Sequence, residues 1–437
     1  MNTPEEIGKL REENRRLKEE VKRLKKIEEE YEDHKRQCAL VHPLLPAFVK
    51  EDRPVRRFNR LGAPLGHPGY FRPLPKHVER VITLPVQQCP TCDGKLSGIQ
   101  ETRSRIIEDL PPTPPPEITK YVIERRYCAN CHALVEADFP HALSGARFGL
   151  RVMLYVAFLK IGLALPEQKV VNLLKMHHSF IICQSEVVSI LDQLRKAFGK
   201  HYLEIEQKIK EAAVKGGDET GWRIDGVNHW LWALVNEEVA WYKVNRRRSY
   251  KVIQPVLQDQ AGKILVRDRL TTYDHLATEN GSAQQICWAH ILRDSKRLAE
   301  RYDEAKTVHR RLKGIFKKAK GFASQGTPGD VDKLLARIDN LGNLRFSFKS
   351  IRTFRNSICR KHRDNLFHFV TNAMVPATNN GTERAIRKAV IIRKISNGSR
   401  SEKGARFLET LLSVIETIKL QKKNPLEEMS RMLTSRA

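Results

Sequence analysis

The fold is decided by residues 216–235, which read Gly-Gly-Asp-Glu-Thr-Gly-Trp-Arg-Ile-Asp-Gly-Val-Asn-His-Trp-Leu-Trp-Ala-Leu-Val. Two runs rich in Trp, Leu and Val flank an Asp-Gly pair, which is typical of a tight turn between antiparallel strands. A third run of the same kind follows at residues 239–244. The pattern predicts a meander of three strands that begins at Asp218, after a break at Gly216 and Gly217.

A second acidic residue follows the next apolar run. Residues 264–266 suit a short buried strand, which leads directly to Asp268. An acid near the start of a three-strand meander and another at the end of the following strand is the order expected of an α/β ribonuclease-H-like core. Arg267 and Arg269 flank Asp268, so they would favour its ionised state and could compete with a metal ion for it.

A third acid lies far downstream in residues 379–387, Asn-Asn-Gly-Thr-Glu-Arg-Ala-Ile-Arg. This stretch predicts the start of a helix that presents Glu383 from its first turn. Asp218, Asp268 and Glu383 together could hold two Mg²⁺ (or Mn²⁺) ions about 4 Å apart for in-line displacement at phosphorus. Magnesium keeps several waters and takes few protein ligands, so three acids are sufficient.

Each acid also has an ordinary structural interpretation. Glu383 lies three residues after Asn380, so it could complete a capping box at the start of the helix. Asp268 could be a strand-end acid paired with a neighbouring arginine, and Asp218 could be a turn residue. The ordered set of three favours the catalytic interpretation.

Residues 1–38 predict a coiled-coil helix. Leu10, Leu17 and Leu24 recur every seven residues, and Asn14 on the adjoining heptad position is typical of dimers held in register. The alternative is one solvated helix that packs on its own protein. Residues 39–85 are rich in Pro, Gly and basic side chains, which indicates a linker that could also follow DNA phosphates.

Residues 86–140 contain two CxxC pairs, Cys89 with Cys92 and Cys128 with Cys131. Four thiolates in tetrahedral array suit a structural zinc ion (Zn²⁺), although unligated cysteines are the alternative. Eight cysteines in so long a chain do not indicate a disulfide framework.

Residues 141–214 predict a helical, helix-turn-helix-like region. Short breaks separate the helical patterns, and Ser185 would cap the third helix, which would read the DNA groove in a DNA-binding unit. Packing without DNA recognition is an equally good interpretation.

The charge of the chain indicates a nucleic-acid partner. Lys and Arg number 78 against 51 Asp and Glu, a formal net charge of +27, and such an excess attracts a polyanion such as DNA. The longest apolar run, residues 152–165, contains Lys160 and is too short to span a bilayer. No signal peptide is visible, so we expect a cytoplasmic, nucleoid-associated protein that does not bind membranes.

Taken together, these motifs resemble the insertion sequence 66 family of DDE transposases, over most of the chain from the CxxC pairs onward. The resemblance is carried by residues 218–222, residues 229–232, Asp268, residues 287–290 (Cys-Trp-Ala-His), Arg293, Asp294, residues 379–387 and residues 415–417 (Ile-Glu-Thr). It implies a ribonuclease-H-like catalytic domain at residues 215–437, with Asp218, Asp268 and Glu383 as metal ligands and a helical insertion at about residues 285–375. It also implies an upstream zinc-binding domain and an N-terminal leucine zipper.

Two further groups are candidate site residues. The resemblance places Cys287 and His290 near the active site, whereas the matching spacing of Cys359 and His362 leaves open a second zinc site made by all four. A basic stretch after Glu383 suits phosphates near the scissile bond, with a solvated helix face as the alternative. It consists of Arg384, Arg387, Lys388, Arg393 and Lys394.

The function expected from the sequence is a DNA transposase. It would bind the ends of an insertion sequence, nick them hydrolytically and join the released 3′ hydroxyl to target DNA. A homodimer or higher oligomer is expected, with small accessory transposition proteins as further candidate partners. The alternatives are a DNA-binding regulator or inactive relic, and a nuclease of the same fold that does not join DNA ends.

Overall fold

The computed structural model describes residues 75–136, 142–258 and 260–434, together with positions 66 and 73 and short stretches between residues 12 and 30. The chain divides into two units, Met1–Ile106 and Ile107–Ala437, each described here by itself. In the first unit the described residues between 12 and 30 are helical, and Leu17, Val21 and Leu24 are exposed. Residues 1–11, Asn14 and most of residues 39–85 lie outside the described residues, so the coiled-coil dimer and the linker stay predictions.

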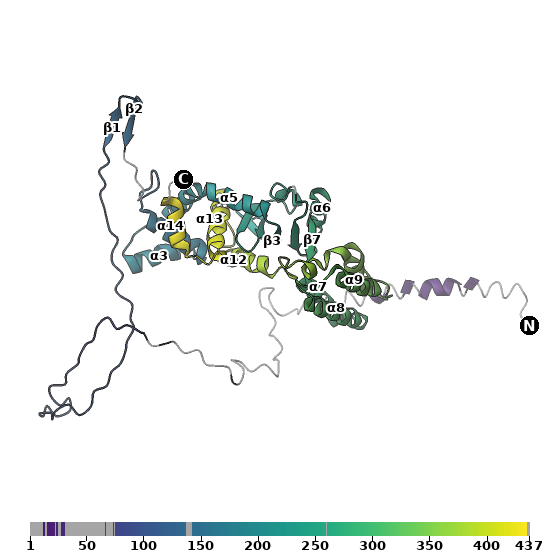
Figure 1. Ribbon diagram of the computed structural model, residues 1–437, viewed down its shortest axis with the longest axis horizontal. Helices are drawn as coiled ribbons and strands as arrows, with labels where there is room; N and C mark the ends of the chain where they lie inside the picture. Colours follow the sequence, from purple (N-terminus) through teal and green to yellow (C-terminus); the bar gives the residue numbers. More distant parts are fainter. Residues whose placement is uncertain are drawn as a thin grey trace, which may run out of the picture. The chain divides into compact units, whose positions relative to one another are not determined.

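A five-stranded mixed sheet forms the centre of the second unit (Figure 1). Its order is β5-β4-β3-β6-β7, in which β3, β4 and β5 form an antiparallel meander and β6 and β7 run parallel to β3. The predicted meander is confirmed, and β7 was not predicted. The strands are β3 (Val214–Ile224), β4 (Val227–Val235), β5 (Ala240–Asn245), β6 (Ile264–Arg267) and β7 (Ala283–Ile286).

The predicted break at Gly216 and Gly217 is wrong, because both glycines lie inside β3. They form part of the antiparallel ladder, opposite Val235 and Leu234 of β4. A glycine inside a strand often marks a place where another part of the chain comes close. Helix α12 (Asn380–Ser396) approaches β3 at this point.

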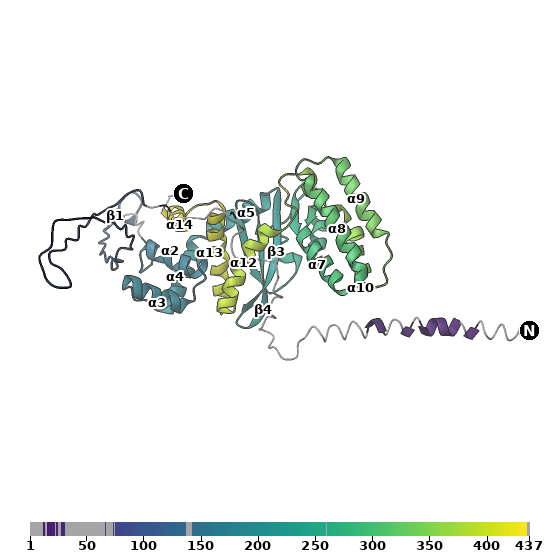
Figure 2. The same ribbon diagram turned by 90° about the horizontal axis from the view of Figure 1, so that it is seen from below.

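Helix α13 (Glu402–Leu420) covers the free edge of β5, and Figure 2 shows it beside the sheet together with α12. Three alternate amides of β5 donate to three side chains that lie four residues apart on α13. The bonds run from Ala240 to Thr417 Oγ1 (3.0 Å), from Tyr242 to Ser413 Oγ (3.0 Å) and from Val244 to Glu409 Oε1 (2.8 Å). The spacing matches because four helical residues rise about 6 Å and two strand residues about 6.8 Å.

The helices that precede the sheet form a packed layer. They are α2 (Leu150–Ala157), which continues as a π-helix to Gly162, α3 (Glu167–His178), α4 (Gln184–Ala197) and α5 (Gly199–Glu211). Ser185 is not the cap that the sequence predicted, because α4 begins at Gln184 and Glu186 accepts the amide of Cys183 (2.8 Å). The apolar residues of α4 lie in one core with those of α2 and α13. This favours a packing role for α4 over groove reading.

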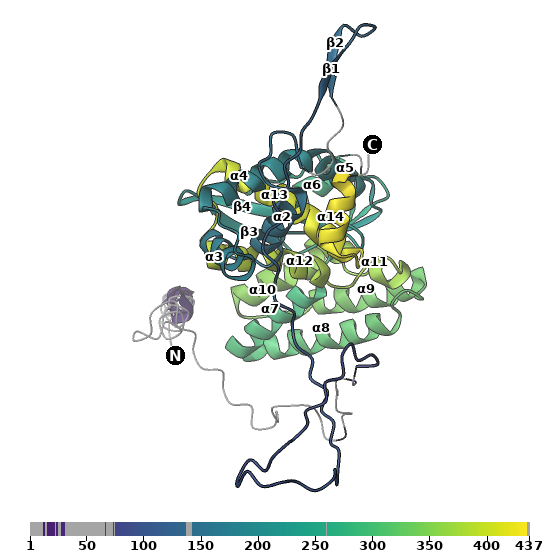
Figure 3. The same ribbon diagram turned by 90° about the vertical axis from the view of Figure 1, so that its left-hand side faces the viewer.

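Helices fill the chain between β7 and α12. They are α7 (Trp288–Arg301), α8 (Asp303–Gly321), α9 (Pro328–Gly342), α10 (Lys349–Asn356) and α11 (His368–Thr371), and Figure 3 shows α7 to α10 grouped together. They enclose a second hydrophobic core, which also includes Val266 of β6 and Ile286 of β7. These helices therefore pack on the strand ends that lead to Asp268 and Cys287.

The other strands and α-helices are the hairpin β1 (Arg125–Cys128) and β2 (Ala133–Glu136), helix α6 (Thr271–Asn280), and helix α14 (Pro425–Thr434). In the part of the chain that the structure describes, no helix is both long enough and apolar enough to cross a membrane.

Candidate active site

Strand β3 presents Asp218 to the first turn of α12. A Cβ atom placed on Gly216 would lie 1.9 Å from Thr382 Oγ1 and 2.7 Å from Asn379 Oδ1, so this face of β3 touches α12 directly. Alternate residues of a strand point to the same face, and Asp218 is two residues beyond Gly216. Gly216 is thus required by the close approach of the helix that carries Glu383.

Asp268 lies at the matching position beside β3. The parallel ladder pairs Gly216 with Val266, and Asp268 follows Val266 by the same two residues that separate Asp218 from Gly216. Asp268 is the first residue after β6, and its Oδ1 accepts the backbone N–H of Leu270 at 2.9 Å. Continued by two residues, this register would direct both aspartates to the face of the sheet on which α12 lies, and the negative charges of Asp268 and Glu383 both raise the pKa of Asp218.

Glu383 is held in the first turn of α12 by bonds that involve Asn379. The amide of Glu383 donates to the carbonyl of Asn379 (3.0 Å), while Asn379 Nδ2 donates to Gly217 O (2.9 Å) and its backbone N–H to Cys287 Sγ (3.1 Å). Asn379 is the boundary residue of the helix, so the capping box from Asn380 to Glu383 is wrong. Asn379 was missed as a site residue because its partners are remote in sequence.

The carboxylates influence one another electrostatically. The pKa of Asp218 is raised to about 7, first by burial and then by the negative charges of Glu219, Asp268 and Glu383. Such crowding of acids is relieved by a divalent cation, which favours the ionised forms. The Oε1 atom of Glu383 is buried and, among the described residues, has no hydrogen-bond partner, although it lies 3.6 Å from His290 Nδ1. These oxygen donors fit the ligand preference of Mg²⁺.

Glu219 is a fourth acid at this site, and the sequence analysis gave it no role. Its side chain is only 2% exposed, on the face of β3 opposite to Asp218. Arg248 donates to its Oε1 (2.7 Å) and the hydroxyl of Tyr273 to its Oε2 (3.1 Å). Burial raises the pKa of Glu219 although Arg248 opposes the shift. The sequence did contain a signal for Glu219, because an acidic residue on the buried face of a predicted strand needs a partner or a function.

The expected competition of arginines for Asp268 is not observed. Arg267 is fully buried and pairs with Asp274, and Arg269 pairs with Asp294. Neither guanidinium forms an ion pair with Asp268 among the residues that the structure describes. The two arginines are satisfied by other acids, which leaves the carboxylate of Asp268 open to a metal ion.

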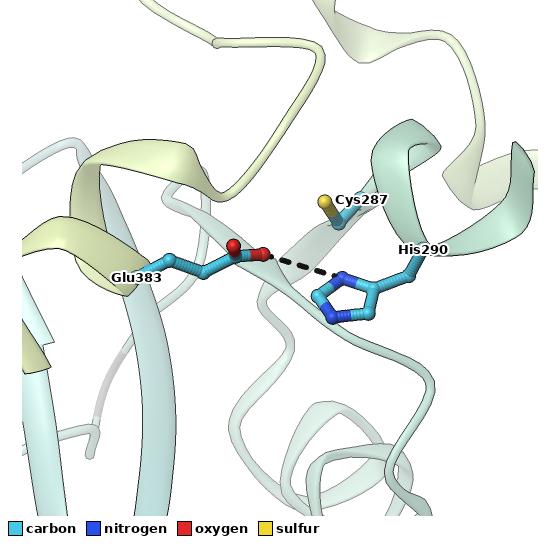
Figure 4. Close-up of side chains that lie close together, drawn as sticks. All are labelled: Cys287, His290 and Glu383. Atoms are coloured by element: carbon cyan, nitrogen blue, oxygen red, sulfur yellow. Dashed lines mark ion pairs between the residues drawn. The ribbon is translucent and has the colours of Figure 1, made fainter. Parts of the chain in front are cut away.

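Cys287 and His290 lie beside Glu383 (Figure 4), with ligand atoms of all three within 4.8 Å of one another. Burial raises the pKa of the Cys287 thiol, but His290 and the Asn379 amide outweigh it, so this pKa is lowered overall. Cys359 and His362 do not belong to this group, so the four-residue zinc site is not formed among the described residues.

The chain is similar to a known protein family. Residues 145–407, more than half of the chain, match the family described as "Transposase IS66 family". The chain belongs to the IS66 transposase family. An uncharacterized protein of Sinorhizobium fredii, y4qI, is 24% identical over 408 residues, which cover 82% of this chain and 72% of that protein. The matched span contains the whole sheet and all three predicted acids.

Four of the five basic residues predicted to contact DNA phosphates remain available on α12. Arg393 instead donates to Thr220 Oγ1 (2.9 Å) and to the carbonyl of Gly221. These bonds fasten α12 to β3, and the phosphate role of Arg393 stays a prediction. The four available residues are Arg384, Arg387 and Lys394, which are exposed, and Lys388, which is half-buried.

The cysteines of the two CxxC pairs fall in different units of the chain, and each pair forms a tight turn. Backbone amides of Thr91 and Cys92 lower the pKa of Cys89, and those of Cys131 and Asn130 lower the pKa of Cys128. Because zinc binds the thiolate form, these turns favour metal binding.

The four-cysteine zinc site stays a prediction, and metal analysis tests it. Purified protein is expected to contain tightly bound zinc, and a Cys89→Ser, Cys128→Ser double variant should contain about one zinc ion fewer per chain. Cys183, an exposed cysteine outside the pairs, provides the control Cys183→Ser. An unchanged zinc content in the double variant would contradict the prediction.

Proposed function

We propose that this member of the IS66 transposase family cleaves DNA at the ends of an insertion sequence and joins the released 3′ ends to target DNA. Asp218, Asp268 and Glu383 would hold the magnesium ions. The observation that carries the proposal is the convergence of β3, the end of β6 and the first turn of α12 at one face of the sheet. The order β5-β4-β3-β6-β7 supports a ribonuclease-H-like core.

The side chains suit the demands of phosphodiester chemistry. Two Mg²⁺ or Mn²⁺ ions would activate the attacking water or 3′ hydroxyl and stabilise the leaving oxygen. Asn379 and Gly216 position Glu383 against β3, while Arg248 and Tyr273 hold Glu219 beneath Asp218. The exposed cations of α12 would neutralise phosphates next to the scissile bond.

The test is an assay of cleavage and joining with the purified full chain. A labelled duplex that carries the element's own end is incubated with supercoiled target DNA in Mg²⁺, with and without chelator. We expect chelator-sensitive nicking at the 3′ end and transfer of the label to the target. Cleavage without transfer would support a nuclease, and DNA binding without metal-dependent cleavage would support a DNA-binding regulator.

A further inference from the structure

Three different ligand atoms converge beside the proposed active site. Cys287 immediately precedes α7, His290 lies in the first turn of α7, and Glu383 reaches them from α12 (Figure 4). The ligand atoms lie within 4.8 Å of one another, and His290 Nδ1 is 3.6 Å from Glu383 Oε1. The sulfur of Cys287, a ring nitrogen of His290 and a carboxylate oxygen of Glu383 thus lie close together, between the start of α7 and the first turn of α12.

Two of these atoms have unmet hydrogen-bonding capacity. His290 Nδ1 and Glu383 Oε1 are both buried, and apart from their mutual ion pair at 3.6 Å neither has a hydrogen-bond partner among the described residues. Buried polar atoms of this kind are few in native proteins, and each calls for an explanation such as a bound ion. Cys287 is fully buried, so its sulfur is shielded from bulk solvent, and it lies next to the ligand atoms of His290 and Glu383.

We propose that Cys287, His290 and Glu383 bind a zinc-class divalent cation, and that this ion regulates the active site by taking Glu383 away from the catalytic magnesium. Thiolate and imidazole select zinc over magnesium, which prefers oxygen ligands. Ligands 2.0–2.3 Å from zinc lie about 3.3–3.8 Å apart in a tetrahedron. The observed 3.6 Å between His290 and Glu383 agrees with this spacing.

Three protein ligands leave one tetrahedral position open, as is usual in exchangeable or catalytic zinc sites and not in closed structural ones. An ion here would hold the Glu383 carboxylate on the α7 side. Asp218 and Asp268 would then lack their third partner. Binding of the zinc-class ion does not depend on the proposed function, whereas its regulatory effect does.

Cobalt is the probe for binding, because a Co²⁺ ion bound by a thiolate absorbs in the near ultraviolet. The full chain is used with Cys89, Cys92, Cys128 and Cys131 replaced by Ser, so that the CxxC pairs do not contribute. We expect a saturable thiolate band that Cys287→Ser abolishes. His290→Gln and Glu383→Gln are expected to weaken cobalt binding at least about tenfold, since even partners of ligands contribute that much. Cys359→Ser, at another buried cysteine, should leave the band unchanged.

Folding of each variant is checked by circular dichroism and thermal unfolding. If the quadruple replacement does not fold, zinc saturation of the otherwise unmodified chain replaces it, and Cys287→Ser should bind one ion fewer per chain. Absence of the band, or a band unaffected by Cys287→Ser, would overturn the proposal.

Competition with magnesium tests whether Glu383 is shared. Excess Mg²⁺ is expected to weaken cobalt binding in the parent chain and to have no effect on the residual binding of the Glu383→Gln variant. An absence of competition in the parent would refute the sharing of Glu383. Both measurements report metal binding and not DNA cleavage, so they can be interpreted even if the cleavage assay shows no activity.

Discussion

Replacement of Asp218, Asp268 or Glu383 by its amide is expected to lower the rate of magnesium-dependent strand cleavage at least about a thousandfold. Each amide preserves the size of the side chain but removes the negative charge and directs an N–H₂ group toward the cation. The measurement is single-turnover cleavage of the labelled duplex, with DNA binding measured in parallel.

Stability separates this catalytic loss from misfolding. Burial and neighbouring acids raise the pKa of Asp218 from 3.8 to about 7, so the metal-free protein loses stability as the pH rises between these two values and carries the full penalty above about pH 7. Asp218→Asn is therefore expected to unfold at an equal or higher temperature than the unmodified protein at pH 8. Glu237→Gln, an exposed acid in the turn between β4 and β5, is the control that should retain activity. Cleavage within tenfold of normal in any of the three amide variants would remove that residue from the proposed ligand set.

The substitution Gly216→Ala is expected to lower cleavage about a hundredfold, although it adds only a methyl group and touches none of the three acids. The new Cβ would overlap Thr382 Oγ1 and crowd Asn379 Oδ1, so the first turn of α12 must move away from β3. Misplacement of a catalytic group by about 1 Å can cost a hundredfold in rate. The strain should also lower the free energy of unfolding by about 1–3 kcal/mol.

Two variants make this prediction specific. Gly221→Ala, in the same strand, places its Cβ 3.5 Å from the nearest atom, an ordinary contact, and should retain cleavage. The double variant Gly216→Ala with Thr382→Ala removes the closest clash and should recover part of the lost rate. Equal activities of the two single glycine variants would show that the contact of α12 with β3 does not position Glu383.

The sequence predicted those parts of the sheet in which local pattern and burial agree. The meander and the strand before Asp268 combine alternating or continuous apolar residues with clear turn signals, and both are present. Strand β7 was missed because Gln284 and Gln285 occupy its centre. Both are buried, and their side-chain amides bond to the carbonyls of Tyr273 and Leu366. A search for hydrophobic patterns misses buried polar residues whose hydrogen-bond partners are distant in the sequence.

The same limit applies to the candidate site. The three acids were identified from motifs and their order, but the reason for Gly216 and the role of Asn379 depend on α12, which is distant in sequence. Local sequence patterns therefore predicted that the strand starts after Gly216, and they allowed Asn380 as the helix cap. Arg267 was placed beside Asp268 by sequence adjacency, whereas strand geometry directs its guanidinium to Asp274.

The hydrogen bonds between α13 and the edge strand β5 determine where a recombinant fragment of the protein can end. The family match ends at residue 407, but the acceptors on Glu409, Ser413 and Thr417 all follow that position. A recombinant fragment trimmed to the matched span would leave three alternate amides of an edge strand uncovered. Such an edge is a template for pairing with other chains and for aggregation. The span that matches the family is therefore shorter than the span that covers this edge of the sheet.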